Sequence, residues 1–324
     1  MQRALITGGA GFIGSHLAQA LLQRGWQVTV IDDLSTGSFA NIEHLVGHPH
    51  FGYAIESITN EMVLDRLASE CGTIFHLAAA VGVKLIIQAP VHTIETNVMG
   101  TEAVLKTALR YRARVLIAST SEVYGKGTRV PFREDDDVVL GPTSRSRWSY
   151  AASKMVDEFL ALAYGSEHGL PITIFRLFNT VGPRQSGRYG MVIPRFVRQA
   201  LQEEPLTVYG DGQQTRCFCN VSDSVTGIVG LAEAPQALGR VFNLGGTDEI
   251  SILDLAHRVL KIVHPTARDW QDRLTFIPYS EAYAAGFEDM QRRVPDITRI
   301  QETIGWQPQI SLDDTIRQVV ATYQ

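Results

Sequence analysis

The chain alternates between short apolar runs and longer segments with an apolar residue at every third or fourth position. "RALITG" (3–8) is apolar and ends in glycine, "FIGSHLAQALLQRG" (12–25) has helical periodicity, and "QVTVIDD" (27–33) is rich in β-branched residues until Asp32. A strand, a helix and a strand within about 30 residues form the unit from which parallel sheets are built. The first segment therefore predicts a β-α-β unit.

The same alternation continues to about residue 179. Further strands are predicted at 73–79, 114–120 and 171–179, and helices at 92–111 and 150–169. Strands that alternate with helices indicate an open sheet with helices on both faces. We predict an α/β fold in which residues 1–179 form a Rossmann-type, doubly wound parallel sheet.

The pattern changes after residue 179. "TVGPRQSGRYGMVIP" (180–194) is rich in Gly, Arg and Pro, which is typical of a loop. Shorter elements follow, with helices near 192–203, 221–233 and 251–263, a strand near 206–209, and a weakly periodic polar segment at 279–297. We expect a smaller α/β substrate-binding domain over residues 180–324, with an approximate boundary across which elements can interleave.

Composition and charge exclude several classes of protein. The 324 residues are 45% hydrophobic, which permits a sizeable core, and the formal net charge of -5 argues against nucleic acid as a partner. No apolar run reaches the roughly 20 residues that a membrane helix needs. The first predicted strand begins at Arg3, which leaves no room for a signal peptide. These features predict a cytoplasmic protein without a membrane partner.

The three cysteines carry no recognisable site. Cys71, Cys217 and Cys219 lack the spacing of a disulfide framework or a zinc site. We interpret Cys217 and Cys219 as residues of a strand and expect no bound metal.

The loop between the first predicted strand and helix carries Gly8, Gly11 and Gly14 at three-residue spacing. In a dinucleotide-binding loop the first glycine permits a tight turn, the second lets the backbone approach the pyrophosphate, and the third lets helix and strand pack closely. The pyrophosphate then lies at the helix N-terminus, whose free N–H groups favour anions. Asp32 follows 18 residues after Gly14. A carboxylate there accepts hydrogen bonds from ribose hydroxyls and repels a 2′-phosphate, so we predict NAD rather than NADP.

Tyr150 and Lys154 are four residues apart on a predicted helix and therefore share one face. A tyrosine has an ordinary pKa near 10, and a nearby ammonium favours its phenolate. Such a phenolate can remove the proton from an alcohol while a hydride leaves the same carbon. Ser119 and Thr120 end the preceding predicted strand, which supports a catalytic pair over a chance spacing.

Several motifs together resemble one family. "TGGAGFIGSHL", "HLAA", "NVMGT", "YAASK", "RLFNTVGPR" and "PLTVYGDGQQTRCFCNVSD" are similar to the extended short-chain dehydrogenase/reductase family of nucleotide-sugar epimerases, dehydratases and decarboxylases, over nearly the whole chain. The resemblance implies an NAD site made of Gly8, Gly11, Phe12, Ile13, Gly14, Asp32, Asp33, Thr36, Gly37, Leu77, Ala78, Ala79, Asn97, Tyr150 and Lys154.

The resemblance also implies a UDP-sugar held between the two domains. Asn179 is expected on the sugar or phosphate, and Tyr209 and Arg216 on the nucleotide, with Lys84 and Val192 also at the substrate. It further implies a homodimer, joined by the helix around residues 100–111 and the helix of Tyr150.

Thr120, Ser121 and Glu122 select among the branches of the family. The 4,6-dehydratases carry Asp-Glu after the threonine, and Ser121 is a poor acid for expelling hydroxide. A simple 4-epimerase does not need Glu122. Thr-Ser-Glu looks like the UDP-glucuronate decarboxylases, of the UDP-xylose synthase type. "FEDMQRRVPDI" (287–297) resembles a decarboxylase segment that places Arg293 in the sugar pocket, on the substrate carboxylate or on the diphosphate.

Decarboxylation follows from oxidation at the sugar C4, which converts a glucuronate into a β-keto acid that loses CO2 readily. Thr120 and Tyr150 are expected to hydrogen-bond the developing enolate oxygen. Glu122 beside a substrate carboxylate is unfavourable unless one of them is protonated or leaves as CO2. Glu122 either assists departure, governs proton delivery, or fixes the loop before Tyr124.

Two other functions stay open. "AAAVGVKLIIQAP" (78–90) looks more like the epimerases, so a UDP-glucuronate or UDP-hexose 4-epimerase is the alternative, and Lys84 either reaches the substrate or is solvated. A non-catalytic NAD-binding regulator is also conceivable on this fold. Tyr150, Lys154 and Thr120 speak against the regulator.

Overall fold

The computed structural model describes residues 1–82, 89–187, 191–267, 270–278, 281 and 290–323. Its centre is a seven-stranded sheet in the order β11-β6-β5-β4-β1-β2-β3, in which all neighbouring strands are parallel. The strands are β1 (Arg3–Thr7), β2 (Gln27–Asp32), β3 (Phe51–Ile55), β4 (Thr73–His76), β5 (Arg114–Thr120), β6 (Ile172–Phe178) and β11 (Arg240–Gly245). The strand order reverses between β1 and β4, which opens a crevice at their carboxyl ends.

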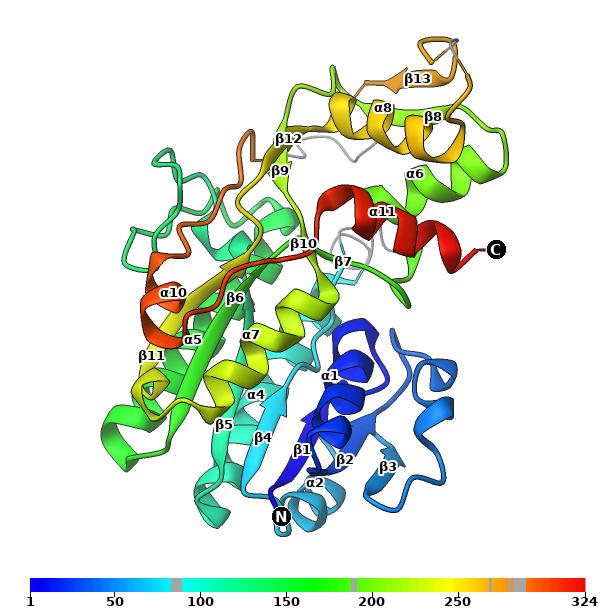
Figure 1. Ribbon diagram of the computed structural model, residues 1–324. Coiled ribbons are helices and arrows are strands. Elements are labelled where there is room, and N and C mark those ends of the chain that lie inside the picture. Colours follow the sequence, from blue (N-terminus) through cyan, green and yellow to red (C-terminus); the bar gives the residue numbers. More distant parts are fainter. Residues whose placement is uncertain (83–88, 188–190, 268–269, 279–280, 282–289, 324) are drawn as a thin grey trace.

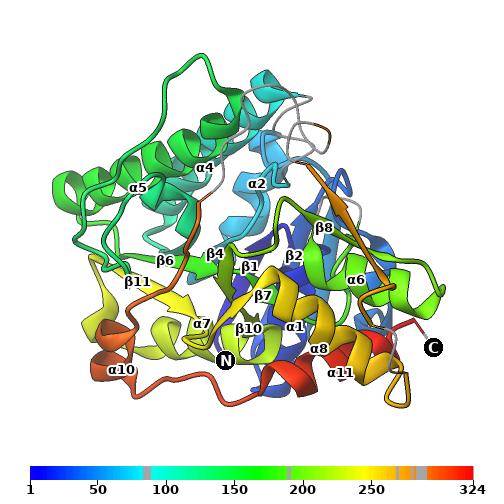
Figure 2. The same ribbon diagram turned by 90° about the horizontal axis from the view of Figure 1, so that it is seen from above.

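Helices cover both faces of the sheet (Figure 2). One face carries α1 (Phe12–Gln23), α7 (Val221–Glu233) and α10 (Thr298–Ile304), and the other carries α2 (Glu61–Ala68), α4 (Pro90–Tyr111) and α5 (Ser149–His168). Adjacent β1 residues divide between the two cores, since Ile6 packs toward α1 and Leu5 toward α4. A strand buried on both faces needs the nearly continuous apolar run seen in the sequence.

A smaller part of the molecule stands over the carboxyl ends of the strands (Figure 1). Its helices are α6 (Val192–Leu201), α8 (Ile252–Val263) and α11 (Leu312–Ala321). Its strands pair as β8 (Leu206–Tyr209) with β13 (Leu274–Ile277), β9 (Thr215–Cys217) with β12 (Glu249–Ser251), and β7 (Thr180–Val181) with β10 (Cys219–Asn220). Phe196, Val208, Leu255 and Ile316 belong to its separate hydrophobic core.

Short 3-10 helices complete the chain. They are η1 (Phe39–Asn41), η2 (Glu43–Leu45), η3 (Ser121–Tyr124), η4 (Ser146–Trp148) and η6 (Pro235–Ala237). η3 follows β5 and itself contains the predicted site residues Ser121 and Glu122. η4 directly precedes α5, which contains Tyr150 and Lys154.

The predicted α/β fold with a doubly wound parallel sheet is confirmed. The sequence reading did not anticipate β3, α2 or β11. The last of these lies beyond residue 180 and pairs with β6 from Arg240 to Gly245, while α7 packs against α1. Segments on both sides of residue 180 therefore build the large sheet and its cover. In the described part of the chain, no helix has the length and apolar character that crossing a membrane requires.

Candidate active site

A cavity of about 1430 Å³ lies between the carboxyl ends of the strands and the smaller part of the molecule. Pockets for single small molecules are usually about 300–1,000 Å³, so this one has room for more than one ligand. It collects predicted site residues that are far apart in the sequence. Those that line it are Gly8, Gly11, Phe12, Ile13, Gly14, Asp32, Asp33, Thr36, Gly37, Leu77, Ala78, Ala79, Thr120, Ser121, Glu122, Tyr150, Asn179, Val192, Tyr209, Arg216 and Arg293.

The glycine loop has the geometry that the spacing predicts. Gly8 has φ +69, and a Cβ there would lie 2.8 Å from the Ala78 backbone nitrogen. A Cβ on Gly14 would lie 2.2 Å from the carbonyl oxygen of Gly8, so helix and loop approach as only glycine permits. Gly11 is the N-cap of α1, and the first residues of this helix line the cavity. The loop is therefore a cradle shaped for an anionic group at a helix N-terminus.

Asp32 ends β2 beside this loop and is buried. Its Oδ2 accepts a hydrogen bond from the Ala10 N–H (2.9 Å), and its Oδ1 accepts one from the Leu34 N–H (2.8 Å). Burial raises the pKa of Asp32, and these backbone donors oppose the rise. A Cβ on Gly37 would come within 2.8 Å of the same carboxylate. Asp32 is thus held rigidly, with lone pairs left for a further donor such as a hydroxyl.

Asn97 and Lys154 are the two described members of the predicted NAD set that lie outside the cavity lining. The Asn97 Oδ1 accepts from the Ala80 N–H (2.8 Å), and its Nδ2 donates to the Ser153 hydroxyl (2.9 Å). Asn97 therefore ties the cavity wall at Ala80 to α5.

Tyr150 and Thr120 lie together at the cavity wall. Tyr150 is buried and hydrogen-bonded to the Thr120 side chain, which lowers its pKa, but burial, Glu122 and Asp157 together raise the pKa of Tyr150 well above its ordinary value. Lys154 is buried one turn after Tyr150 in α5 and does not line the cavity; its Nζ donates to Asp157 Oδ2 (2.8 Å). A cationic ligand in the cavity would add the positive charge that favours the phenolate.

His76 extends this buried group. Its Nδ1 lies 2.8 Å from the Thr7 hydroxyl and its Nε2 lies 3.0 Å from the Thr101 hydroxyl. Burial, aided by the charge of Lys154, lowers the pKa of His76 to about 3, so the imidazole is neutral at physiological pH.

Glu122 lies between two guanidinium groups. The Arg293 NH2 is 2.7 Å from Glu122 Oε1, and the Arg147 NH2 is 2.6 Å from Oε2. Burial opposes ionisation, but Arg293 and Arg147 outweigh it and lower the pKa of Glu122 to about 2. Glu122 is therefore ionised at neutral pH. Two cations around one anion leave a net positive charge, to which the nearby Arg216 adds.

Arg147 was not among the predicted site residues. It belongs to η4, lies three residues before Tyr150, and its guanidinium carbon is 5.6 Å from the centroid of the Trp148 ring. The sequence signal is in "SRWSY" (146–150), where an arginine lies three residues before the predicted catalytic tyrosine. Sequence spacing alone does not show that Arg147 reaches Glu122.

The other predicted substrate residues also line the cavity. The Asn179 Nδ2 donates to the Cys217 carbonyl (2.8 Å), and the Arg216 NH1 donates to the Thr215 carbonyl (2.7 Å). The Arg195 guanidinium carbon lies 4.2 Å from the centroid of the Tyr209 ring. Val192 begins α6. Lys84 lies outside the described residues.

The two neighbouring cysteines are strand residues, as interpreted. Cys217 ends β9 and Cys219 begins β10, and both are buried, with burial raising the pKa of each thiol to about 12. The described ranges contain no group of three or more His, Cys, Asp or Glu residues that could hold a metal ion.

Comparison with known proteins places this arrangement in a family. Residues 5–319 match the sequence profile of the family described as GDP-mannose 4,6 dehydratase. The chain belongs to this family. The expected membership among the NAD-dependent epimerases and dehydratases is thereby confirmed.

Individual relatives cover nearly the whole chain. A UDP-N-acetyl-alpha-D-glucosaminuronate decarboxylase of Bacillus cytotoxicus is 41% identical over 324 residues, which is 100% of this chain and 98% of that protein. UDP-glucuronic acid decarboxylase 1 of Danio rerio is 37% identical over 319 residues, 98% of this chain and 72% of that protein.

A solved structure is also similar. UDP-glucuronic acid 4-epimerase from Bacillus cereus, in complex with UDP-glucuronic acid and NAD, is 29% identical with a TM-score of 0.87. The match covers 99% of this chain and 98% of that chain.

Proposed function

We propose that this chain catalyses the NAD-dependent decarboxylation of UDP-glucuronate through a 4-keto intermediate, giving UDP-xylose or a UDP-4-keto-pentose. The observation that carries the proposal is the pair of guanidiniums, Arg147 and Arg293, that converge on Glu122. A neutral hexose offers these guanidiniums no charge to pair with, whereas a uronate supplies a carboxylate.

The cavity wall fits NAD. Only glycine is tolerated at Gly8 and Gly14, where a side chain would overlap the backbone, and this leaves the N-terminus of α1 open to a pyrophosphate. Asp32 would hold the ribose hydroxyls. When bound, NAD+ supplies the hydride acceptor for oxidation of the sugar C4.

Tyr150 is the proposed base for that oxidation. Its phenolate oxygen would take the proton of the C4 hydroxyl, and the Thr120 hydroxyl, already hydrogen-bonded to Tyr150, would donate to the oxygen that becomes the ketone. Lys154, one turn further along α5, would contribute its positive charge. The same two groups then stabilise the enolate oxygen that forms when CO2 leaves.

Glu122 and its two arginines are the proposed carboxylate subsite. Because Glu122 is ionised, a substrate carboxylate can enter only by sharing Arg147 or Arg293 with it. Loss of neutral CO2 relieves the repulsion between the two carboxylates, which favours departure over return. Ser121, buried beside Glu122, offers a hydroxyl but no acid for dehydration.

The relatives support decarboxylation and raise one question of substrate. The Bacillus cytotoxicus protein is named for a 2-acetamido uronate and the Danio rerio protein for UDP-glucuronic acid. Both sugars carry the carboxylate that the proposal requires, so both belong in the assay.

The alternative is a UDP-glucuronate or UDP-hexose 4-epimerase, which the likeness to the Bacillus cereus epimerase favours. It would share every step up to the 4-keto sugar. Incubation with NAD+ and UDP-glucuronate, followed by CO2 detection and nucleotide-sugar chromatography, separates the two. Release of CO2 with a UDP-pentose supports the proposal, and UDP-galacturonate without CO2 establishes the epimerase. Tyr150→Phe is the inactive control.

We further propose that the chain forms a homodimer through α4 and α5, which pack against each other. Large apolar side chains are exposed on both helices, with Phe159 at 66%, Val91 at 66% and Met99 at 59%. Exposed large apolar side chains on two helices that pack together support an interface between copies at this place. The division at residue 179, the cytoplasmic location and the roles of the individual site residues stay predictions.

A further inference from the structure

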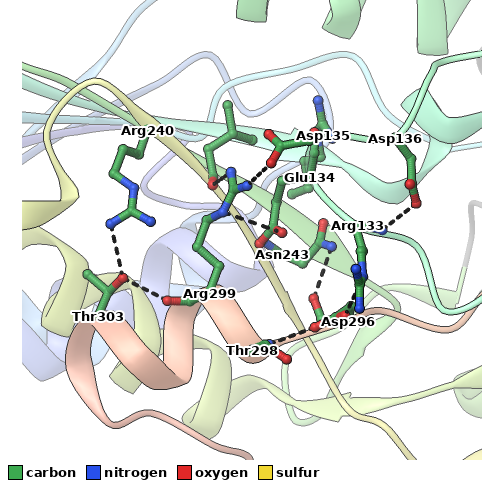
Figure 3. A network of polar contacts seen from close by, with 12 residues as sticks. Arg133, Glu134, Asp135, Asp136, Arg240, Asn243, Asp296, Thr298, Arg299 and Thr303 are labelled. Atoms are coloured by element: carbon green, nitrogen blue, oxygen red, sulfur yellow. Dashed lines mark hydrogen bonds and ion pairs between the residues drawn. The ribbon is translucent and has the colours of Figure 1, made fainter.

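Asn243 connects two segments that carry the proposed carboxylate subsite. It lies within β11 and is fully buried. Its Oδ1 accepts a hydrogen bond from the Tyr124 hydroxyl (2.6 Å), and its Nδ2 donates to the Phe132 carbonyl (2.9 Å). The same Nδ2 donates to the Asp296 carbonyl (3.1 Å) (Figure 3). All three partners lie outside its own strand. Asn243 therefore joins three separate stretches of chain through one side chain.

Two of those partners are close neighbours of Glu122 and Arg293. Tyr124 lies two residues after Glu122 in η3, and Asp296 lies three residues after Arg293. The stretch after Arg293 is also tied by backbone bonds, since the Phe132 N–H donates to the Val294 carbonyl (2.8 Å) and the Asp296 N–H donates to the Phe132 carbonyl (2.8 Å).

The η3 side of this connection is rigid. The Tyr124 ring stacks on Phe132 with 4.6 Å between centroids and an interplanar angle of 6°. Its hydroxyl also accepts from the Arg176 NH1 (2.9 Å), and Arg176 is held by Glu158 (2.7 Å). These groups are buried, so an unpaired partner among them would be costly.

The other side is braced from outside. Arg133 Nε donates to Asp296 Oδ2 (3.0 Å), while Glu134 Oε1 accepts from the Asn243 N–H (2.8 Å) and Glu134 Oε2 faces Arg299 (3.7 Å) (Figure 3). These contacts fix the backbone around Asn243, while its side-chain amide makes the hydrogen bonds to Tyr124, Phe132 and Asp296. Only an amide offers one acceptor and two donors at the same end of a short side chain.

We propose that Asn243 is a positioning residue that sets where Arg293 stands relative to Glu122, and thereby the selectivity for a sugar carboxylate. This inference rests on the proposed function. Arg293 and Glu122 come from distant parts of the sequence, and their 2.7 Å contact depends on the two backbones keeping their spacing. Asn243 is hydrogen-bonded to the Tyr124 hydroxyl on the Glu122 side and to the Asp296 carbonyl on the Arg293 side, so it can act on both residues through their neighbours.

The test measures carboxylate preference, which is the ratio of the dissociation constants of UDP-glucose and UDP-glucuronate on the NADH-bound protein, by calorimetry. NADH prevents turnover. We expect Asn243→Ala to reduce this ratio about tenfold while the dissociation constant of UDP changes less than about twofold. In an Arg293→Met background the same substitution should change the ratio less than about twofold, because residues that act through one another are not additive.

Tyr124→Phe is the milder variant, should Asn243→Ala fail to fold. It keeps the ring stacked on Phe132, removes only the hydroxyl, and should reduce the ratio about threefold. Asn220→Ala is the matched control, since Asn220 is an equally buried asparagine that caps α7 and bonds to Thr315 and Gln318. It should leave the ratio unchanged.

Three outcomes overturn the inference. The first is an unchanged ratio in both Asn243→Ala and Tyr124→Phe. The second is a loss of UDP affinity in Asn243→Ala as large as the loss of carboxylate preference. The third is that Asn243→Ala reduces the ratio in the Arg293→Met background as much as it does in the wild-type background. A wild-type protein that binds UDP-glucose and UDP-glucuronate equally refutes the proposed function itself, and the inference with it, so the two failures are distinguishable.

Discussion

Lys154 donates a hydrogen bond from Nζ to Asp157 Oδ2 over 2.8 Å, and both side chains are almost entirely buried. The ammonium that would favour the Tyr150 phenolate is thus paired with a carboxylate on the next turn of α5. Burial, Glu122 and Asp157 each raise the pKa of Tyr150. Asp157 fixes the lysine in place at the expense of part of its electrostatic effect.

The first prediction concerns Asp157, whose negative charge raises the pKa of Tyr150. Asp157→Asn removes a negative charge but keeps an oxygen that can accept from Lys154, so the pKa of Tyr150 should fall. In the proposed mechanism activity requires the phenolate, so it rises with pH through that pKa, and the rising limb should move to lower pH. The measurement is the pH profile of kcat for UDP-glucuronate at saturating NAD+. Exposed Asp137→Asn is the control, and a limb that moves to higher pH would contradict the argument.

Glu122 makes a second prediction, on stability. Its pKa is lowered from 4.5 to about 2, so its ionised form is stabilised in the folded protein. This stabilisation is complete above about pH 4.5. It disappears as the pH falls through about 2, because Glu122 is then protonated in both the folded and the unfolded protein. At about 1.4 kcal/mol per pKa unit, it is on the order of 3 kcal/mol.

Glu122→Gln should therefore lower the free energy of unfolding at pH 7, and the deficit should shrink as the pH falls from 4.5. Urea unfolding of both proteins between pH 7 and pH 3 measures it. Exposed Glu302→Gln should show no such dependence. A deficit that stays constant with pH would mean that lost packing, rather than lost charge, explains the effect.

The glycine loop and the strand-helix alternation could be predicted because both depend on local sequence. Gly8 and Gly14 needed only their spacing and their place between a strand and a helix. β11 could not be found in this way, since "RVFNLG" (240–245) is short and its strand partner lies more than sixty residues earlier in the chain. Its place in the sheet is decided by tertiary pairing with β6.

Among the candidate site residues, some relations are local in the sequence and others depend on the tertiary fold. Tyr150 and Lys154 share a helix face, so their relation is local. Arg147 reaches Glu122 through the turn η4, and Asn243 reaches Tyr124 across more than a hundred residues. The ionisation of Glu122 also depended on both arginines, which explains why the sequence left open whether it was protonated.

Gly14 makes the third prediction. A Cβ at this position would lie 2.2 Å from the Gly8 carbonyl oxygen and 2.8 Å from the Gly9 Cα, both backbone atoms that cannot turn aside. Gly14→Ala should therefore destabilise the protein by about 2 kcal/mol or more and weaken NADH binding. Gly72→Ala is the matched control, because a Cβ there meets nothing within 4 Å. Thermal unfolding and NADH titration check it, and equal behaviour of the two variants would disprove the packing argument.

Asp32 makes the fourth prediction, on cofactor choice. Asp32→Asn keeps an acceptor for one of the two backbone N–H groups but removes the charge that would repel a 2′-phosphate. Affinity for NADH should fall about tenfold, since hydrogen bonds to a charged group are the stronger ones, while affinity for NADPH should rise. Titration of both dinucleotides measures the ratio. A parallel loss for both would show that Asp32 supports only the loop.

The last prediction concerns the exposed face of α4 and α5. Phe159 is 66% exposed and Val156 is 43% exposed on α5, and their three-residue spacing puts them on one face of the helix. If a second copy covers them, Phe159→Glu would bury an unpaired charge at the seam and should shift the protein from dimer to monomer. Sedimentation velocity at micromolar concentration measures the shift. Exposed Met62→Glu, on α2, is the control and should leave the dimer intact. A wild-type protein that sediments as a monomer, or a Phe159→Glu variant that stays dimeric, would rule out this face as the interface.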